Sequence, residues 1–208
     1  MKKAIIVISV IIISFIAGWT LMAPSLNYFD KYHLGVVLKK GSGTVKNGSW
    51  TTRLDLAQSN TPPLTRAYIA RIGIAANQAI EAIYWNAYTD NMGHMLDGTH
   101  SYDIRFKGRP PVRTDGFWSL TVYDKNSYLV ANNEKRYSVG DRSPIIKDKG
   151  GSFIIKISSN KPINNYNWLP CPSSENFSLT LRMYLPLEDA LKQTKSISMP
   201  EIVCLDCL

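Results

Sequence analysis

The sequence has few cysteines, and their number is odd. Three occur in 208 residues, at positions 171, 204 and 207, which excludes a framework of fully paired intramolecular disulfides. Cys204 and Cys207 form a C-x-x-C motif, but no second C-x-x-C supplies the two further ligands of a structural zinc site. Because only Leu208 follows the motif, we expect no thioredoxin-like helix after it and interpret the pair as a tail disulfide or as free thiols.

Other patterns are also missing from the sequence. There is no run of five or more basic residues, although the net charge is +8, so nucleic acid is not an expected partner. The chain lacks the G-x-S-x-G motif that marks a hydrolase nucleophile. His94 and His100 share one loop with Asp90 and Asp97, but their spacing matches neither a zinc helix nor a calcium loop. We interpret these four as solvated turn residues and expect neither a metal nor a cofactor.

The first residues include the longest apolar run. Two lysines in the tip 1–3 precede the uncharged segment 4–23, and about twenty such residues are needed to cross a bilayer as a helix. Because basic residues stay in the cytoplasm, we expect the tip to be cytoplasmic and the remainder to be exported. A cleaved signal peptide is the alternative. The positions around Ala17 and Ala23 match an A-x-A-like cleavage site poorly, so we favour an uncleaved signal anchor.

The exported part divides into three regions. A connector at 24–46 ends in the Gly- and Ser-containing stretch "KKGSGTVKNG". A β-sandwich domain is predicted at 47–190 and a C-terminal tail at 191–208. Within the domain, apolar residues recur at helical spacing after Thr65, which predicts a helix from Thr65 to Ala79. A short closing helix is predicted after Pro186, because proline is favoured in the first turn of a helix.

Several segments alternate in the way that β-strands do. In "FWSLTVY", the side chains of Trp118, Leu120 and Val122 point to one face, which we interpret as core. Phe117 and Tyr123 point the other way, and they either line a groove or pack beneath a loop. The same alternation occurs in "HSYDIRF", "SFIIKI" and "FSLTLRMYL". The pattern predicts a mainly β fold, namely an antiparallel, jelly-roll-like β-sandwich with one helix packed on it and a single transmembrane helix before it.

Seven phrases between Asn47 and Pro186 then occur in an order typical of one bacterial family. They are "NGSW", "TRAYIARIGI", "EAIYWNAYTD", "FWSLTVYD", "RYSVGDRSP", "NWLPCP" and "FSLTLRMYLP". Together they resemble the family called domain of unknown function 1214, in the stand-alone form behind one N-terminal membrane helix. The resemblance implies a jelly-roll-like β-sandwich and no settled activity. Where the family has "NWLPAP", this chain has Cys171 in place of the alanine, which we interpret as a packing residue.

The anchor and the bacterial resemblance together predict a location. We expect a single-pass protein of the bacterial inner membrane, with the lipid bilayer as the partner of residues 4–23 and the globular domain in the periplasm.

Two polar loops and one strand supply candidate ligand-binding residues. The first loop, "NEKRYSVGDRSP", contains two arginines and an aspartate, which can form a fork for a carboxylate, a phosphate or a sugar hydroxyl. The second, "NWLPCP", offers an indole on which a sugar ring stacks if the indole is exposed. We hypothesise that these residues converge on one pocket at an end of the sandwich. The alternative is that the charged residues only join the loops and the indole fills the core. The candidates are Arg136, Asp141, Arg142, Asn167, Trp168, Arg182 and Tyr184.

The most favoured function is that of a non-catalytic envelope domain that binds a glycan or a protein partner. The alternative is a carbohydrate- or carboxylate-active enzyme with a pocket at one end of the sandwich, and no catalytic residue is identified for it. In a third interpretation, the exposed aromatic face is the interface of a homo-oligomer.

Overall fold

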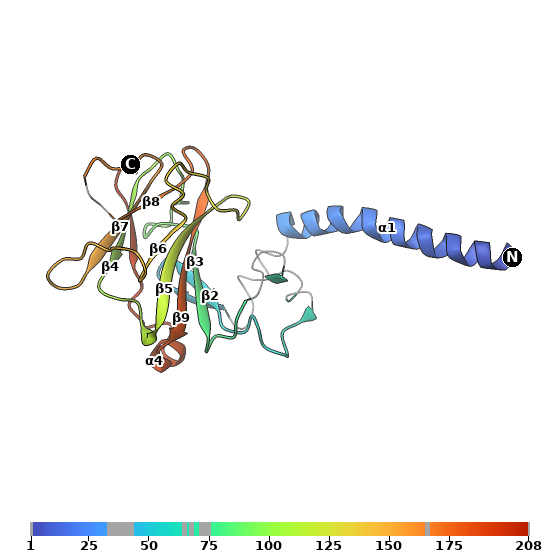
Figure 1. The fold of residues 1–208 in the computed structure, drawn as a ribbon, viewed down its shortest axis with the longest axis horizontal. Helices are drawn as coiled ribbons and strands as arrows, with labels where there is room; N and C mark the ends of the chain where they lie inside the picture. The colour runs from blue at the N-terminus through green and yellow to red at the C-terminus, as the bar shows by residue number, and fades with distance from the viewer. Residues whose placement is uncertain are drawn as a thin grey trace. The chain divides into compact units, whose positions relative to one another are not determined.

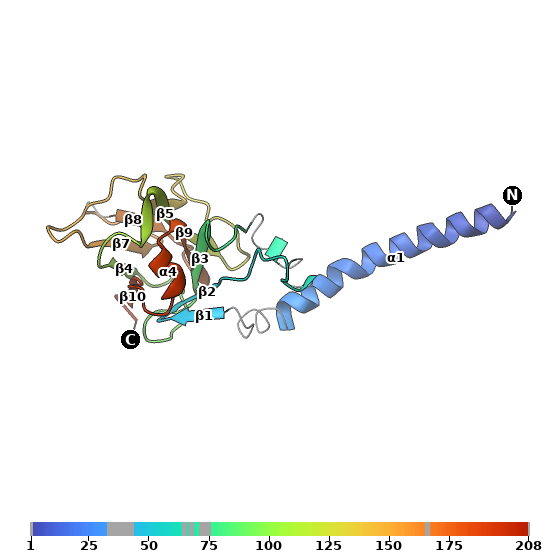
Figure 2. The same cartoon turned by 90° about the horizontal axis from the view of Figure 1, so that it is seen from below.

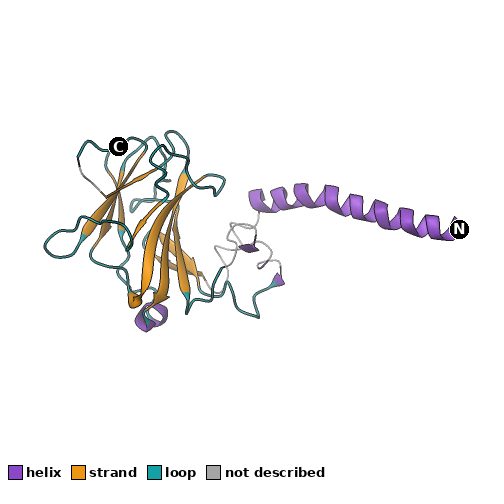
Figure 3. Ribbon diagram, in the orientation of Figure 1, coloured by secondary structure: helices purple, strands orange, loops and turns teal. Residues whose placement is uncertain are grey.

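The chain divides into two compact units, Met1–Ser42 and Gly43–Leu208, which we describe separately. We call the second unit the β domain, because strands make up most of its regular structure (Figure 3). The computed structural model describes residues 2–32, 44–63, 66, 69–70, 76–164 and 167–207.

The N-terminal unit contains one long helix, α1 (Lys2–Tyr32). Its 18-residue segment Ile5–Met22 is long and apolar enough to cross a membrane, and its side chains are exposed. The predicted connector began at residue 24, but the helix continues through Pro24 to Tyr32. A proline removes one backbone N–H, and here that loss does not end the helix.

The larger sheet of the β domain has six strands in the order β1-β2-β3-β9-β5-β6, and all its pairs are antiparallel (Figure 1). Its two longest strands, β5 and β9, pair continuously from Phe117 opposite Tyr184 to Asp124 opposite Phe177. A bulge interrupts their register between Val112 and Phe117. The strands are β1 Thr44–Asn47, β2 Trp50–Arg53, β3 Ala82–Ala87, β5 Val112–Asp124, β6 Ser138–Gly140 and β9 Phe177–Pro186.

The smaller sheet has four strands in the order β10-β4-β7-β8. The β7–β8 pair is parallel, with Ile155 opposite Asn167 and Ser158 opposite Pro170, whereas we predicted antiparallel pairing throughout. Alternation along a strand shows which side chains share a face but not the direction in which the strand runs. The strands are β4 Tyr102–Phe106, β7 Phe153–Ser158, β8 Asn167–Pro170 and β10 Glu201–Cys204.

The two sheets pack against each other around one hydrophobic core. The ring of Trp118 on β5 lies across the interface from two rings of the smaller sheet, with centroid distances of 5.2 Å to Phe106 on β4 and 5.5 Å to Phe153 on β7. Leu120 and Val122 are also buried, so the predicted inward face of "FWSLTVY" is confirmed. Each such burial contributes about 1.5–3 kcal/mol to folding. The fold is therefore the mainly β, two-sheet architecture that the alternation predicted.

The helix predicted from Thr65 to Ala79 is only partly within the described residues. Arg66, Ile69 and Ala70 are helical, but residues 76–78 have no helical structure and residues 79–81 form a turn. The prediction is therefore wrong at its C-terminal end. Ile80 and Ile83 continue the helical spacing of apolar residues into β3. The spacing by itself therefore did not show where the helix ends. The closing helix is confirmed as α4 (Glu188–Lys192), which directly follows β9.

Two segments that we predicted to lie outside the sandwich belong to its sheets. Strand β1 lies in the predicted connector, and a two-residue turn with Gly48 at φ 60° joins it to β2. Strand β10 lies in the predicted tail and pairs with β4 (Figure 2). Side chains also join the β1–β2 hairpin to the chain before β10, because Trp50 of β2 donates its indole N–H to Pro200 O (2.7 Å) and Asn47 Nδ2 of β1 donates to Ile197 O (2.9 Å).

Gly140 allows β6 to lie close to β5. A Cβ added at this glycine would lie 2.1 Å from the carbonyl oxygen of Trp118, which cannot move without disturbing the β5–β6 pair. Gly108 provides a matched comparison, because a Cβ there would meet nothing within 4 Å.

We expect Gly140→Ala to lower the melting temperature of the full-length protein in detergent by about 2–12 °C. Overpacking costs about 1–3 kcal/mol, and 1 kcal/mol shifts the melting temperature by about 2–4 °C at this size. Tryptophan fluorescence during heating measures the shift, and Gly108→Ala should leave the temperature unchanged or slightly raised. Equal melting temperatures for the two variants would contradict this account of Gly140.

Candidate functional site

One cavity of the β domain lies where the outermost strands of the two sheets meet. Strand β6 is the last strand of the larger sheet and β8 the last of the smaller sheet. Val139 of β6 and Trp168 of β8 both line the cavity, whose volume is about 540 Å³. The loop after β7 adds Lys161 and Ile163. The cavity, which we call the edge pocket, therefore combines charged and apolar side chains.

The positive charge of the edge pocket comes from Arg136 and Lys161. Arg136 Nη1 donates to the carbonyl oxygen of Trp168 (2.9 Å), which uses one of the five N–H donors of a guanidinium. Lys161 Nζ lies 2.8 Å from Glu134 Oε1. The hydrogen bond from this lysine lowers the pKa of the Glu134 carboxyl, so that side chain stays ionised. With two cations and one anion, these three side chains give the pocket a net positive charge.

Asn167, which we predicted to contact a ligand, lines the edge pocket and also holds a loop against β8. Its Oδ1 accepts the N–H of Ile146 (2.7 Å), and its Nδ2 donates to Ile146 O (2.8 Å) and Ile154 O (2.9 Å). The Asn167 side chain therefore both accepts a hydrogen bond from Ile146 N–H and donates one to Ile146 O. A paired strand forms the same two kinds of bond with its neighbour. Asn167 is 8% exposed, so water does not replace these bonds easily. These bonds fix the position of the Asn167 side chain in the wall of the edge pocket.

Trp168 also differs from the prediction. The prediction needed an exposed indole face, but Trp168 is only 6% exposed. Its Nε1–H is shared between the carbonyl and hydroxyl oxygens of Ser158, each 3.1 Å away. Because the polar atom is satisfied inside the protein, the ring forms an apolar part of the pocket wall rather than a stacking platform.

Asp141 lies at a second, smaller cavity of about 220 Å³. Its two carboxylate oxygens accept hydrogen bonds from Arg109 at 3.3 and 2.9 Å. The same guanidinium donates to the backbone oxygens of Val112, Arg113 and Gly116, which surround the bulge in β5. The pair therefore stabilises the bulge, and Arg109 was not among the site residues predicted from the sequence.

The remaining three candidates lie on the outward face of the larger sheet. Arg142 lies over the ring of Phe117, with Cζ 4.4 Å from its centroid, and Phe117 stacks on Tyr184 at 4.3 Å. Arg182 donates to the hydroxyls of Thr121 (3.0 Å) and Tyr123 (2.5 Å). Burial raises the pKa of Tyr184, so its hydroxyl remains protonated at neutral pH.

The predicted convergence on one pocket is therefore wrong. The structure brings together Arg136, Asn167 and Trp168, and it places the other four candidates in separate contacts. Strand alternation explains part of the error. Arg182 and Tyr184 point outward because Leu181 and Met183 point into the core. Lys161 and Glu134 were missed, since single charged residues in loops give no local sign of which loops meet.

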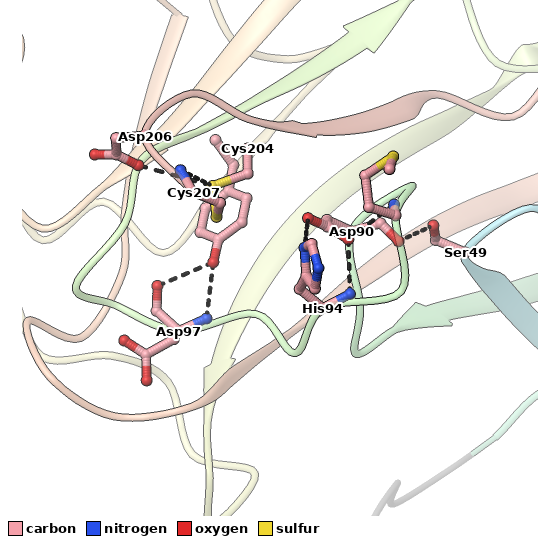
Figure 4. Close-up of polar contacts among 9 residues, drawn as sticks. Ser49, Asp90, His94, Asp97, Cys204, Asp206 and Cys207 are labelled. Atoms are coloured by element: carbon pink, nitrogen blue, oxygen red, sulfur yellow. Dashed lines mark hydrogen bonds and ion pairs between the residues drawn. A yellow bond between two sulfur atoms is a disulfide. The ribbon is translucent and has the colours of Figure 1, made fainter.

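The loop with the two histidines is organised by its two aspartates. Figure 4 shows the bonds between Asp90 and His94. Asp90 Oδ1 accepts the N–H groups of Met92 and His94, each at 2.9 Å, and Oδ2 lies 3.3 Å from His94 Nδ1. Asp97 Oδ1 accepts the N–H (2.7 Å) and the hydroxyl (2.6 Å) of Thr99. These bonds are typical of turns, as predicted, but the prediction of a solvated residue is wrong for Asp90, which is only 2% exposed.

The three cysteines have two different environments. Cys204 and Cys207 form a disulfide, whereas Cys171 is a free thiol that is 5% exposed. Burial raises the pKa of the Cys171 thiol to about 12, so almost none of it is thiolate at neutral pH. This environment fits the packing role that we predicted for it. Asp206 lies close to both disulfide sulfurs, but bonded sulfurs are not thiolate ligands for a metal.

Comparison with known proteins identifies the family of this chain. The model of the family described as protein of unknown function (DUF1214) matches residues 81–188, slightly more than half of the chain. The chain belongs to this family. The match covers β3 to β9. It therefore includes all the residues of this chain that line the edge pocket.

A solved structure with a similar fold is also known. The crystal structure of the VPA0106 protein from Vibrio parahaemolyticus is similar, with 33% sequence identity and a TM-score of 0.57. The match covers 71% of this chain but only 36% of that protein, so this chain spans about a third of its length. An uncharacterised protein from Burkholderia cenocepacia matches at 15% identity and a TM-score of 0.40, over 74% of this chain and 46% of that one. No curated protein matches the chain.

We expect Asn167→Ala to destabilise the protein by about 1–3 kcal/mol, because it removes three hydrogen bonds between the buried Asn167 amide and the backbone of Ile146 and Ile154. At about 2–4 °C per kcal/mol, the melting temperature of the full-length protein should fall by about 2–12 °C. Asn133→Ala, at an exposed position of a neighbouring loop, is the control. An equal effect of the two substitutions would show that the Asn167 amide does not hold the loop.

Proposed function

We propose that this protein is a membrane-anchored domain of the bacterial cell envelope that binds an acidic glycan in the edge pocket. The observation that carries the proposal is the pairing of two cationic side chains, Arg136 and Lys161, with apolar walls in a cavity of about 540 Å³. That volume lies within the range of about 300–1,000 Å³ found for small-ligand sites.

The composition of the pocket favours a ligand with an acidic group and apolar faces. A guanidinium binds carboxylates and phosphates through paired hydrogen bonds, and an ammonium acts as a point charge. Ile146, Ile163 and Trp168 supply apolar surface beside these groups. Acidic sugars match this combination, because their rings present C–H faces and their carboxylates carry the charge.

Binding is better supported than catalysis. A glycosidase needs a carboxylic acid whose pKa is raised enough to donate a proton. The hydrogen bond from Lys161 instead lowers the pKa of Glu134, which is the carboxyl group of the edge pocket. A carboxylate that is held ionised is suited to orienting a cation and not to acting as a general acid.

Two features support attachment to the inner membrane with the β domain in the periplasm. Helix α1 is long and apolar enough to cross a bilayer, and the two lysines before its apolar part favour a cytoplasmic N-terminus. The disulfide between Cys204 and Cys207 is typical of proteins in an oxidising compartment.

The pocket can be tested with the full-length protein in nanodiscs. Soluble peptidoglycan fragments with free carboxylates should bind, and neutral N-acetylglucosamine oligomers should bind more weakly. We expect Arg136→Gln to weaken binding of the acidic fragments about tenfold or more in calorimetry. A hydrogen bond to a charged group contributes about 1.5–3 kcal/mol, and 1.4 kcal/mol corresponds to tenfold in affinity.

Arg113→Gln is the matched control, because Arg113 is an exposed arginine that pairs with Asp115 outside the pocket. The proposal fails if the acidic fragments do not bind at millimolar concentration. It also fails if the two arginine variants weaken binding equally, since that result would indicate attraction to the overall charge.

The anchor can be tested in bacterial cells by replacing Ile12 with Asp. A charged residue at the centre of a membrane helix costs about 2.5–3.5 kcal/mol, so Ile12→Asp should move protein from the carbonate-washed membrane pellet to the supernatant. Leu129→Asp, at an exposed position of the β domain, should stay in the pellet. Protease added to intact spheroplasts should digest the β domain, and full protection there would place it in the cytoplasm.

A further inference from the structure

The disulfide between Cys204 and Cys207 lies at the end of β10, the outermost strand of the smaller sheet (Figure 4). Both cysteines are partly exposed, and the residues between them, Leu205 and Asp206, are exposed. A partner can therefore reach this disulfide, unlike the buried thiol of Cys171.

The disulfide is not needed to hold the chain in place. Strand β10 already pairs with β4 along its length. Beyond the strand, Leu205 N donates to Ser101 O (2.9 Å), and Asp206 Oδ1 accepts the N–H of Ser101 (2.9 Å). A cross-link that closes a loop of two intervening residues also restricts the unfolded chain less than one that closes a long loop. Its contribution to stability is therefore small.

The surroundings of the two sulfurs differ in a way that matters for exchange chemistry. The backbone N–H of Cys207 points at Cys204 Sγ, with N and S 3.1 Å apart. A donor in that position stabilises negative charge on Cys204 once the bond is broken, and a stabilised thiolate is the better leaving group. The Asp206 carboxylate lies 3.7 Å from the same sulfur and opposes that charge.

We propose that Cys204 and Cys207 form a thiol–disulfide exchange site that is reduced by a dithiol protein of the envelope. A thiolate of the partner attacks Cys207 Sγ, the bond between the two sulfurs breaks, and its electron pair leaves on Cys204. The second thiol of the partner, as its thiolate, then attacks the mixed disulfide and releases Cys207. Two electrons and two protons pass to this chain, and the partner leaves with a disulfide.

The full-length protein in detergent can be equilibrated with mixtures of reduced and oxidised glutathione. A maleimide polymer then modifies the free thiols, so the fraction of reduced protein can be read from the shift in mass. We expect half-reduction within the glutathione series, with Cys171 unmodified because it is buried, and no fall in melting temperature on reduction. If the disulfide stays intact throughout the series and yields only to excess dithiothreitol, the proposal is overturned. A fall of many degrees on reduction would also overturn it, because the bond would then be a structural cross-link.

Two further measurements test the roles of the individual atoms. When the reaction is stopped with acid, mass spectrometry should locate the glutathione adduct on Cys207, and an adduct on Cys204 would contradict the assigned direction. Asp206→Asn keeps an oxygen for the Ser101 N–H but removes the charge near Cys204. We expect it to raise the equilibrium constant for reduction at least threefold, while Asp189→Asn, at an exposed position elsewhere, leaves it unchanged. Equal values for the two variants would contradict the role given to the Cys204 thiolate.

Discussion

The ladder between β5 and β9 is the interaction on which the other features of the β domain depend. Its inward side chains include Leu120, Leu179 and Leu181, all 0% exposed, and burying each contributes about 1.5–3 kcal/mol. Because side chains alternate along a strand, the same ladder determines which residues face outward. This register places Arg182 and Tyr184 on the outer face.

The edge pocket follows from how the two sheets end. An outermost strand presents backbone groups that need partners, and a side chain supplies one of them for β8 while a β8 side chain binds the neighbouring loop. Asn167 binds the backbone of Ile146, and Arg136 binds the carbonyl oxygen of Trp168. These bonds stabilise the loops that surround the cavity. The groups that complete the sheets are therefore also the groups that shape the proposed binding site, where Arg136 has both roles.

Several polar residues of this protein serve the backbone. Arg109 joins Asp141 to the bulge of β5, and Asp90 organises the turn that follows β3. A charged side chain with several donors or acceptors can form hydrogen bonds with several backbone groups of an irregular segment at once. The fixed directions of these bonds hold the segment in one conformation. Sequence alone does not separate this use from ligand binding, since both require the same residue types.

The sequence by itself determined the features that depend on consecutive residues. The uncharged segment 4–23 predicted a helix long enough for a membrane, and the alternation in "FWSLTVY" predicted a sheet with Trp118 inside. It did not predict β1 and β10, whose segments resemble a connector and a tail. Only the tertiary structure decided which loops meet, which strands run parallel and which of the candidate residues share a pocket. Those outcomes depend on contacts between residues far apart in the chain, and no local pattern encodes such contacts.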